Sequence, residues 1–139
     1  MTAIASPDDG VLLAVAGAHL TGQPLHGDLL VRGGRLAAVT RTAAVYRMVA
    51  LPRCPGVPVP RPGLIRDPLA GAAVEVEVYR MPVDAVGSLL LTVAPPLAIG
   101  TVTLADGTDV AGFVCEGYAA ADAPDITRYG GWRSYLASR

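Results

Sequence analysis

Lysine is absent from this 139-residue sequence, and all 11 basic residues are arginine. This absence excludes Schiff-base chemistry, serine–lysine nucleophile pairs and P-loop phosphate binding, because each of them requires a lysine. An anion site in this chain must therefore use arginine, histidine or backbone N–H groups. Charge is also scarce, at 17% of residues with a net charge of -1, so no nucleic-acid partner is expected.

Cysteine is nearly as rare, with only Cys54 and Cys115. Their spacing fits neither a zinc motif nor a disulfide framework. Cys115 lies in an apolar run, where a free cysteine is usually a small buried side chain. No second acidic cluster at metal-ligand spacing accompanies Glu75 and Glu77. We therefore expect no metal and no other cofactor.

Long apolar runs are missing too, since no segment approaches the roughly 18 uninterrupted apolar residues of a membrane span. The apolar stretch at residues 11–16 follows Asp8 and Asp9, where a signal peptide requires positive charge. The sequence therefore predicts a cytoplasmic protein without a membrane partner.

Hydrophobic residues are abundant instead, at 52% of the chain. A chain of this length most simply forms one domain with a substantial core. We predict a flexible N-terminal segment at residues 1–10 and a single domain over residues 11–139. A chain with this many hydrophobic residues leaves apolar surface exposed, which is unfavourable in water. The composition therefore predicts a homodimer.

The order of apolar runs and turn signals predicts an α+β fold. Strands are expected at residues 11–16, 35–42, 45–51, 71–79, 99–104 and 109–115. Helices are expected from Met81–Pro82 to about Val93 and from Gly131 to the C-terminus. Residues 17–34 are predicted to be mostly loop with room for one helical turn, and residues 52–68 a proline-rich connection without a helix. Together these elements predict a small mixed barrel-like β-sheet with one or two packed helices.

His19 is the residue best suited to proton transfer. It follows the apolar run at residues 11–16 and opens a glycine-rich loop, where backbone N–H groups and room for a ligand are expected. We expect its pKa near the unperturbed value of about 6.5. From the residues alone, a site role and a structural role are equally open for His19, whereas His26 is expected to be a surface residue.

Two further groups of polar residues each allow two interpretations. Glu75 and Glu77 share one face of a strand, which fits a paired-carboxylate site but is more typical of a solvated strand face. Arg41 and Tyr46 are expected on adjacent strands, where a carboxylate clamp and exposed side chains are equally plausible. The four serines lie in no nucleophile elbow, so serine hydrolase chemistry is not expected.

An ordered set of short motifs resembles the C-terminal domain of allophanate hydrolases. The first is VAGAHLTGQPL at residues 15–25, which is similar to the VxGAHLxGxPL segment that opens that domain. The similarity continues through TRTA at 40–43, RPGL at 61–64, VEVEV at 74–78, PLAIGT at 96–101, LADG at 104–107 and GGWR at 130–133. It covers nearly the whole chain from residue 11 to about residue 136.

This resemblance implies a gamma-glutamylcyclotransferase-like fold, related to AIG2-like proteins, with a pocket at one mouth of a small barrel. In the cyclotransferases a general acid/base glutamate follows the strand–helix unit, and the corresponding place here is near Val93. The segment TVAPP at residues 92–96 has no acidic residue, so cyclotransferase activity is not expected.

The same resemblance implies a lyase or hydrolase of urea degradation that acts on N-carboxycarbamate or a related urea-derived carboxylated amide. The catalytic residue would be His19, as the proton donor or as the group that orients a water molecule. The small carboxylated substrate would be held by Gly17, Ala18, Leu20, Arg41 and Tyr46. The alternative is a non-catalytic interaction or ligand-binding module that organises a separately encoded amidase.

Overall fold

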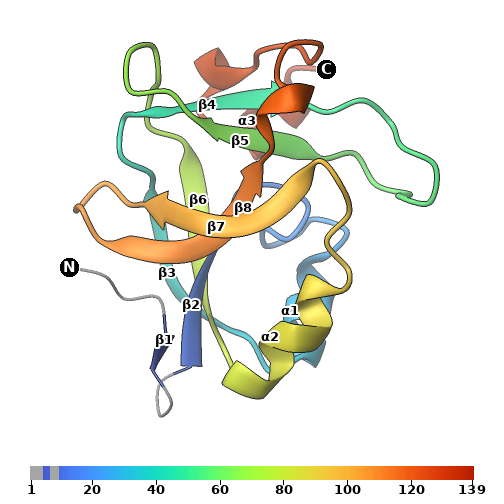
Figure 1. Cartoon of the computed structure of the whole chain (residues 1–139), viewed down its shortest axis with the longest axis vertical. Helices are drawn as coiled ribbons and strands as arrows, with labels where there is room; N and C mark the ends of the chain where they lie inside the picture. Colours follow the sequence, from blue (N-terminus) through green and yellow to red (C-terminus); the bar gives the residue numbers. More distant parts are fainter. Residues whose placement is uncertain (1–4, 7–9) are drawn as a thin grey trace.

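The computed structural model describes residues 5–6 and 10–139, which form two β-sheets and several short helices (Figure 1). Five strands of the main sheet follow the order β3-β6-β2-β8-β7, and β1 pairs with β2 beside this path. These strands are β1 (Ala5–Ser6), β2 (Gly10–Val15), β3 (Arg35–Arg41), β6 (Glu75–Met81), β7 (Leu97–Thr103) and β8 (Asp109–Cys115). Because β2 pairs antiparallel with β6 and parallel with β8, the sheet is mixed, and the predicted α+β class is confirmed.

Strand β2 lies in the middle of the main sheet. Its residues 13–15 are at most 3% exposed, as the continuous apolar run predicts. The neighbouring strand β6 is buried on both faces from Val76 to Tyr79. The loop that follows β2 therefore begins inside the molecule.

Strands β4 (Tyr46–Ala50) and β5 (Pro62–Arg66) form a second, two-stranded antiparallel sheet. The proline-rich connection predicted at residues 52–68 thus contains a strand. Pro62 is the first residue of that strand, a position where the missing N–H is tolerated. Met48 of β4 and Leu64 of β5 belong to the same buried core as β2 and β6, so both sheets contribute to the main core.

The α-helices are α1 (His26–Val31), α2 (Val83–Leu90) and α3 (Trp132–Ala137), with 3-10 turns at Gly117–Ala119 and Thr127–Tyr129. Helix α1 forms within the stretch predicted as mostly loop, and α2 ends three residues before the predicted Val93. Figure 1 shows α1 and α2 side by side at one end of the molecule and α3 at the other end, near β4. Arg32, which follows α1, donates to the Ser88 hydroxyl of α2 and ties the two helices together.

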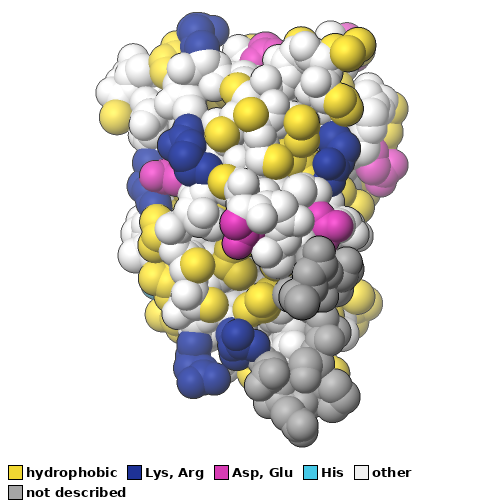
Figure 2. Space-filling model, turned by 90° about the vertical axis from the view of Figure 1, so that its left-hand side faces the viewer, with side chains coloured by type: hydrophobic (Ala, Val, Ile, Leu, Met, Phe, Trp, Pro, Cys, Tyr) yellow, Lys and Arg dark blue, Asp and Glu magenta, His cyan; other side chains and the backbone are white. Residues whose placement is uncertain are grey.

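Residues 1–4 and 7–9 of the predicted flexible segment lie outside the described residues, whereas Ala5–Ser6 pair with β2. Arginine, acidic and hydrophobic side chains are interspersed on the face that Figure 2 shows, without an extended patch of one charge. Within residues 5–6 and 10–139, no helix has the length and apolar character that crossing a membrane requires.

Candidate functional site

The loop after β2 carries most of the predicted site residues and folds back on itself. The Leu20 N–H donates to the Gly17 carbonyl at 3.0 Å, and the Leu25 N–H donates to the Ala18 carbonyl at 2.8 Å. Gly17 lies against the ring of Pro62, which a Cβ at position 17 would meet at 2.4 Å. The absence of a side chain at Gly17 therefore lets the loop approach the start of β5 and form one wall of a pocket with it.

The pocket has two parts, an inner part of about 50 Å³ and an outer part of about 320 Å³. Both parts are lined by His19, Leu25, Arg61, Leu97 and Phe113. The inner part reaches residues 16–18 and Met48. The outer part reaches residues 56–59 of the proline-rich segment and residues 92–94 after α2. The site is thus assembled from segments that are far apart in the sequence.

His19 lines both parts of the pocket and is half-buried. Its ring stacks on Phe113 of β8, with the ring centroids 4.8 Å apart and the planes 15° apart. Burial lowers the pKa of His19 below its ordinary value of 6.5, although Asp28 partly opposes this effect. The prediction of an unperturbed pKa is therefore wrong, because the stacked ring has lost water that would solvate its cation. None of the hydrogen bonds within residues 10–139 involves this ring, which leaves its nitrogens to a ligand.

Arg61 is the cationic side chain of the pocket, and it is only 7% exposed. Its Nη1 and Nη2 donate to the carbonyl oxygens of Ala94 and Pro95 at 3.1 and 3.2 Å. A guanidinium has five N–H donors, so these two bonds leave donors for a ligand. Among the described carboxylates, none forms an ion pair with Arg61. A buried charge without a counter-ion is costly, and a bound anion would remove that cost.

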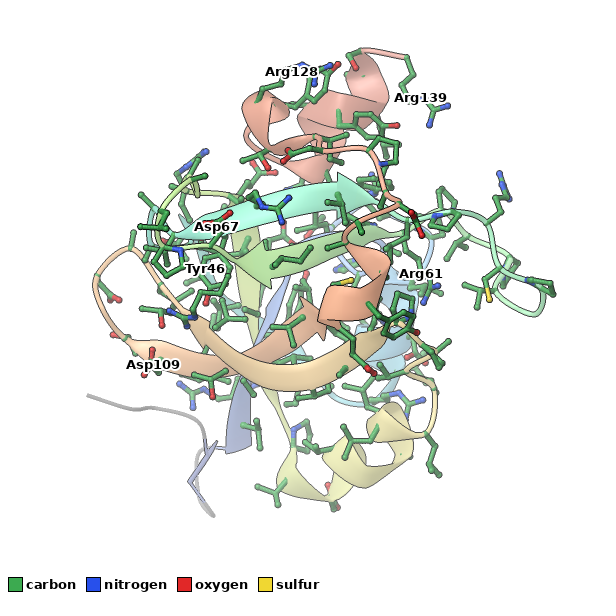
Figure 3. All side chains as sticks on the ribbon, turned by 45° about the horizontal axis from the view of Figure 1, so that its top comes forward. Tyr46, Arg61, Asp67, Asp109, Arg128 and Arg139 are labelled. Carbon is green, nitrogen blue, oxygen red and sulfur yellow. The ribbon has the colours of Figure 1, made fainter. Side chains whose placement is uncertain are left out.

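Arg41 and Tyr46, the other predicted carboxylate holders, do not line this pocket. The Arg41 guanidinium donates to the backbone carbonyls of residues 73 and 130, and the Tyr46 hydroxyl accepts from Arg66. Tyr46 begins β4, whereas Arg61 precedes β5 at the opposite end of the strand pair (Figure 3). These two side chains are therefore not among the residues that line the pocket with His19.

The structure brings together Gly17, Ala18 and His19 of the predicted set and buries Leu20 completely in the core. Sequence reasoning missed Arg61, because this arginine stands in a proline-rich segment without regular spacing. The signal that could have identified it was the RPGL motif at residues 61–64, which belongs to the family resemblance.

The wall of the pocket after α2 has no acidic residue. Residues 92–94 line the outer part of the pocket and include no acid. The carboxylate among the lining residues is Asp28, whose oxygen lies 3.1 Å from the Arg32 Nε one helical turn later. The pocket can therefore hold an anion near Arg61 and transfer a proton at His19.

A buried carboxylate, Glu77, fixes the loop that carries His19. Glu77 is 3% exposed, so the solvated strand face predicted for it is wrong. It accepts hydrogen bonds from the Thr21 N–H at 2.8 Å, the Thr21 hydroxyl at 3.0 Å, the Tyr79 hydroxyl at 3.0 Å and Arg133 at 3.1 Å. Burial alone raises the pKa of Glu77, but these hydrogen bonds outweigh burial and lower it. Arg133 also donates to the Thr21 carbonyl at 2.9 Å, which connects the loop to α3.

Replacing Thr21 with valine is expected to lower the free energy of unfolding by about 1 kcal/mol at pH 7, the usual contribution of one hydroxyl hydrogen bond. The folded-state pKa of Glu77 lies below 4.5, so the stability contributed by its ionised form is present above 4.5 and lost as pH falls. Urea unfolding at pH 7 and pH 3.5 measures the free energy of unfolding of the wild-type chain and of the variant. The matched control is Thr101→Val, at an exposed position of β7, and an equal loss in both variants would contradict the prediction.

Other titratable groups add nothing to the pocket. Within the described part of the chain, no group of three or more His, Cys, Asp and Glu side chains could hold a metal ion. The ring of His26, at the start of α1, lies 5.9 Å from that of Tyr79. Cys54 is exposed, and Cys115 is buried as predicted.

Comparisons with known proteins identify relatives of nearly the whole chain. The family model for the allophanate hydrolase C-terminal domain matches residues 11–137. Urea amidolyase of Saccharomyces cerevisiae is 41% identical over 133 residues, and that of Lachancea kluyveri is 39% identical over 134 residues. Each match covers 94% of this chain, which spans about 7% of the length of either relative.

Solved structures give the same result. A structure of Kluyveromyces lactis allophanate hydrolase is 38% identical with a TM-score of 0.87, covering 93% of this chain and 21% of that one. A protein described as specific to uropathogenic E. coli is 33% identical with a TM-score of 0.82. That match covers 92% of this chain and 96% of the E. coli chain, so the two chains are of similar length.

Proposed function

The chain belongs to the allophanate hydrolase C-terminal domain family, and from this premise we propose that its pocket binds and decarboxylates a carboxylated amide of urea degradation. The proposed substrate is N-carboxycarbamate or a close relative. Relatives named urea amidolyase and allophanate hydrolase support the assignment to urea degradation. The proposed fold type is the gamma-glutamylcyclotransferase-like barrel.

The observation that carries this proposal is the pairing of Arg61 and His19 on one pocket. Arg61 is buried without a carboxylate partner among the described residues, and His19 presents a titratable ring to the same pocket. In the proposed reaction, Arg61 and the loop backbone hold one carboxylate of the dianion. The C–N bond to the other carboxylate breaks, carbon dioxide leaves, and the electron pair on nitrogen takes a proton from His19. The dianion and one proton thus give carbon dioxide and carbamate.

The test generates N-carboxycarbamate from allophanate with an amidase that lacks this domain. Carbon dioxide release is then measured with and without the purified chain. Acceleration above the spontaneous rate supports decarboxylation, and a rate equal to the spontaneous one contradicts it. The alternative function, a module that organises a separately encoded amidase, predicts instead that the chain binds the amidase and leaves this rate unchanged.

Turnover of gamma-glutamyl amino acids to 5-oxoproline is expected to be absent. The reaction needs an acid/base carboxylate, and residues 92–94 supply none to the pocket. Chromatographic detection of 5-oxoproline is the measurement. Product formation at an enzyme-like rate, abolished by His19→Ala, would refute this expectation.

We also propose that the chain forms a homodimer. Exposed apolar side chains lie on α1, on β3 and at the end of α2, including Val31 at 89% exposed, Val39 at 64% and Leu91, which follows α2, at 89%. Water penalises such surface, and a second copy would cover part of it. Light scattering at micromolar concentration is expected to give twice the chain mass of 14.2 kDa. A mass equal to that of one chain would contradict the dimer.

A further inference from the structure

The outer part of the pocket is wider than the proposed substrate requires. Its volume is about 320 Å³, beside an inner part of about 50 Å³. N-carboxycarbamate has seven non-hydrogen atoms, and each occupies no more than the roughly 30 Å³ of a liquid water molecule. A dianion of this size held at Arg61 and His19 would share the outer part with water, and water weakens electrostatic interactions.

One wall of the outer part belongs to a strap, which we define as residues 52–60 between β4 and β5. Figure 1 shows this connection extending beyond the end of the strand pair. At the base of the strap the Leu51 N–H donates to the Arg61 carbonyl at 3.0 Å. Within the described part of the chain, the hydrogen bonds of the strap itself stay between residues 54 and 57. Hydrogen bonds to the other described residues therefore fix the base of the strap and not the strap.

The strap has an apolar face toward the pocket. Val57 and Val59 are half-buried and line the outer part, whereas the strap residues next to them in the sequence are exposed. Neither valine is among the described residues that form the two hydrophobic clusters of the core or pack against them. The prolines at positions 52, 55, 58 and 60 stiffen the strap, since proline fixes its backbone angle φ. The strap can therefore move as one piece about its base without breaking core contacts.

We infer that the strap closes over the bound substrate and that Val57 and Val59 then cover the anion site. This inference rests on the proposed function, because the ligand over which the strap closes is the dianion held by Arg61. Closure excludes water from the pocket, which strengthens the attraction between the dianion and the guanidinium. It also leaves His19 as the proton source for the substrate nitrogen, because bulk water no longer reaches the reacting atoms. The strap thus gives a small substrate an enclosed site in a wide pocket.

Two side chains of this protein allow the movement to be measured directly. Cys54 on the strap is exposed, whereas the other cysteine, Cys115, is buried, so a thiol-reactive fluorophore labels Cys54. Trp132 is the single tryptophan, and it is fixed in the core at 2% exposed. It lines a groove together with Arg53 and Pro60, which lie near the two ends of the strap. A strap that swings into the outer part of the pocket therefore carries Cys54 away from Trp132.

The experiment measures energy transfer from Trp132 to the fluorophore on Cys54 while malonate is added to the full chain. Malonate is a stable dianion with the carboxylate spacing of N-carboxycarbamate, because a methylene takes the place of the N–H group. Energy transfer is expected to fall as malonate binds, with the same Kd that calorimetry gives for the unlabelled chain. The Cys54→Ser chain, treated with the same reagent, corrects for labelling elsewhere and for direct effects of malonate on Trp132.

Two variants locate the effect. Val59→Ser removes part of the apolar face and destabilises the closed strap. Malonate is therefore expected to bind this variant about tenfold more weakly, which corresponds to about 1.4 kcal/mol. Val39→Ser, at a valine that is 64% exposed on β3 and is not a lining residue of the pocket, is the matched control. It is expected to leave both the affinity and the energy transfer unchanged.

The outcomes separate the strap from the anion site. Malonate that binds by calorimetry without lowering the energy transfer overturns the closure and leaves the proposed function intact. Equal malonate affinity in Val59→Ser and the wild-type chain has the same consequence. Failure of malonate to bind by calorimetry overturns the proposed anion site and, with it, the closure.

Discussion

Replacing Arg61 with methionine is expected to weaken carboxylate binding by about fiftyfold. Hydrogen bonds that involve a charged group contribute about 1.5–3 kcal/mol each, and a guanidinium holds a carboxylate through at least one of them. Arg61 is only 7% exposed, so water does not screen this interaction as it would at the surface. Methionine keeps much of the volume and removes only the donors and the charge.

The design separates binding from folding. Arg61 also supports the chain after α2 through its bonds to Ala94 and Pro95, so each variant is first checked by thermal unfolding. Arg61→Lys retains the charge but loses the fork of donors, and it is expected to bind with intermediate affinity. Arg53→Met removes an exposed arginine from the same segment and serves as the matched control. Acetate affinity that is equal in Arg61→Met and the wild-type chain would contradict the anion site.

The strands were predictable from sequence where local patterning decides them. The apolar run before Gly17 indicated a strand, and the strands expected at residues 99–104 and 109–115 correspond to β7 and β8. Strand β5 was not predictable in the same way. Its sequence begins with Pro62 and Gly63, two residues that usually argue against a strand, and its pairing with β4 supplies the stability.

Only the part of the candidate site that lies in one stretch of sequence, the loop that carries His19, was predictable. His19 stands directly after a strand, so a single stretch of sequence was enough to place it at the mouth of a loop. Arg61 reaches the same pocket from a segment about 40 residues later, through contacts that no periodicity encodes. Glu77 was misjudged for the same reason, because its burial depends on Arg133 and Thr21, which are each 56 residues away.

His19 is expected to carry the proposed turnover, and His19→Gln is expected to lower the rate acceleration by about 100- to 10,000-fold. Glutamine preserves a polar side chain of similar reach but cannot transfer a proton. The loop around it is held independently by Glu77 and Thr21, so the fold is expected to persist. Carbon dioxide release from N-carboxycarbamate is the measurement, and undiminished acceleration in the variant would contradict the catalytic role.

The pH dependence gives a second test that does not require turnover. In the free chain burial lowers the pKa of His19 below 6.5, so protonation favours the unfolded chain and stability falls as pH drops below 6.5. A bound carboxylate stabilises the imidazolium, and carboxylate affinity is therefore expected to rise as pH falls through the lowered pKa and to be flat well above 6.5. His19→Gln is expected to remove this rise, whereas His26→Gln is expected to retain it. Calorimetric titration of propionate between pH 5.5 and 8 measures the profile. Equal profiles in the wild-type chain and His19→Gln would exclude His19 from the anion site, because the two proteins differ only in that titrating ring.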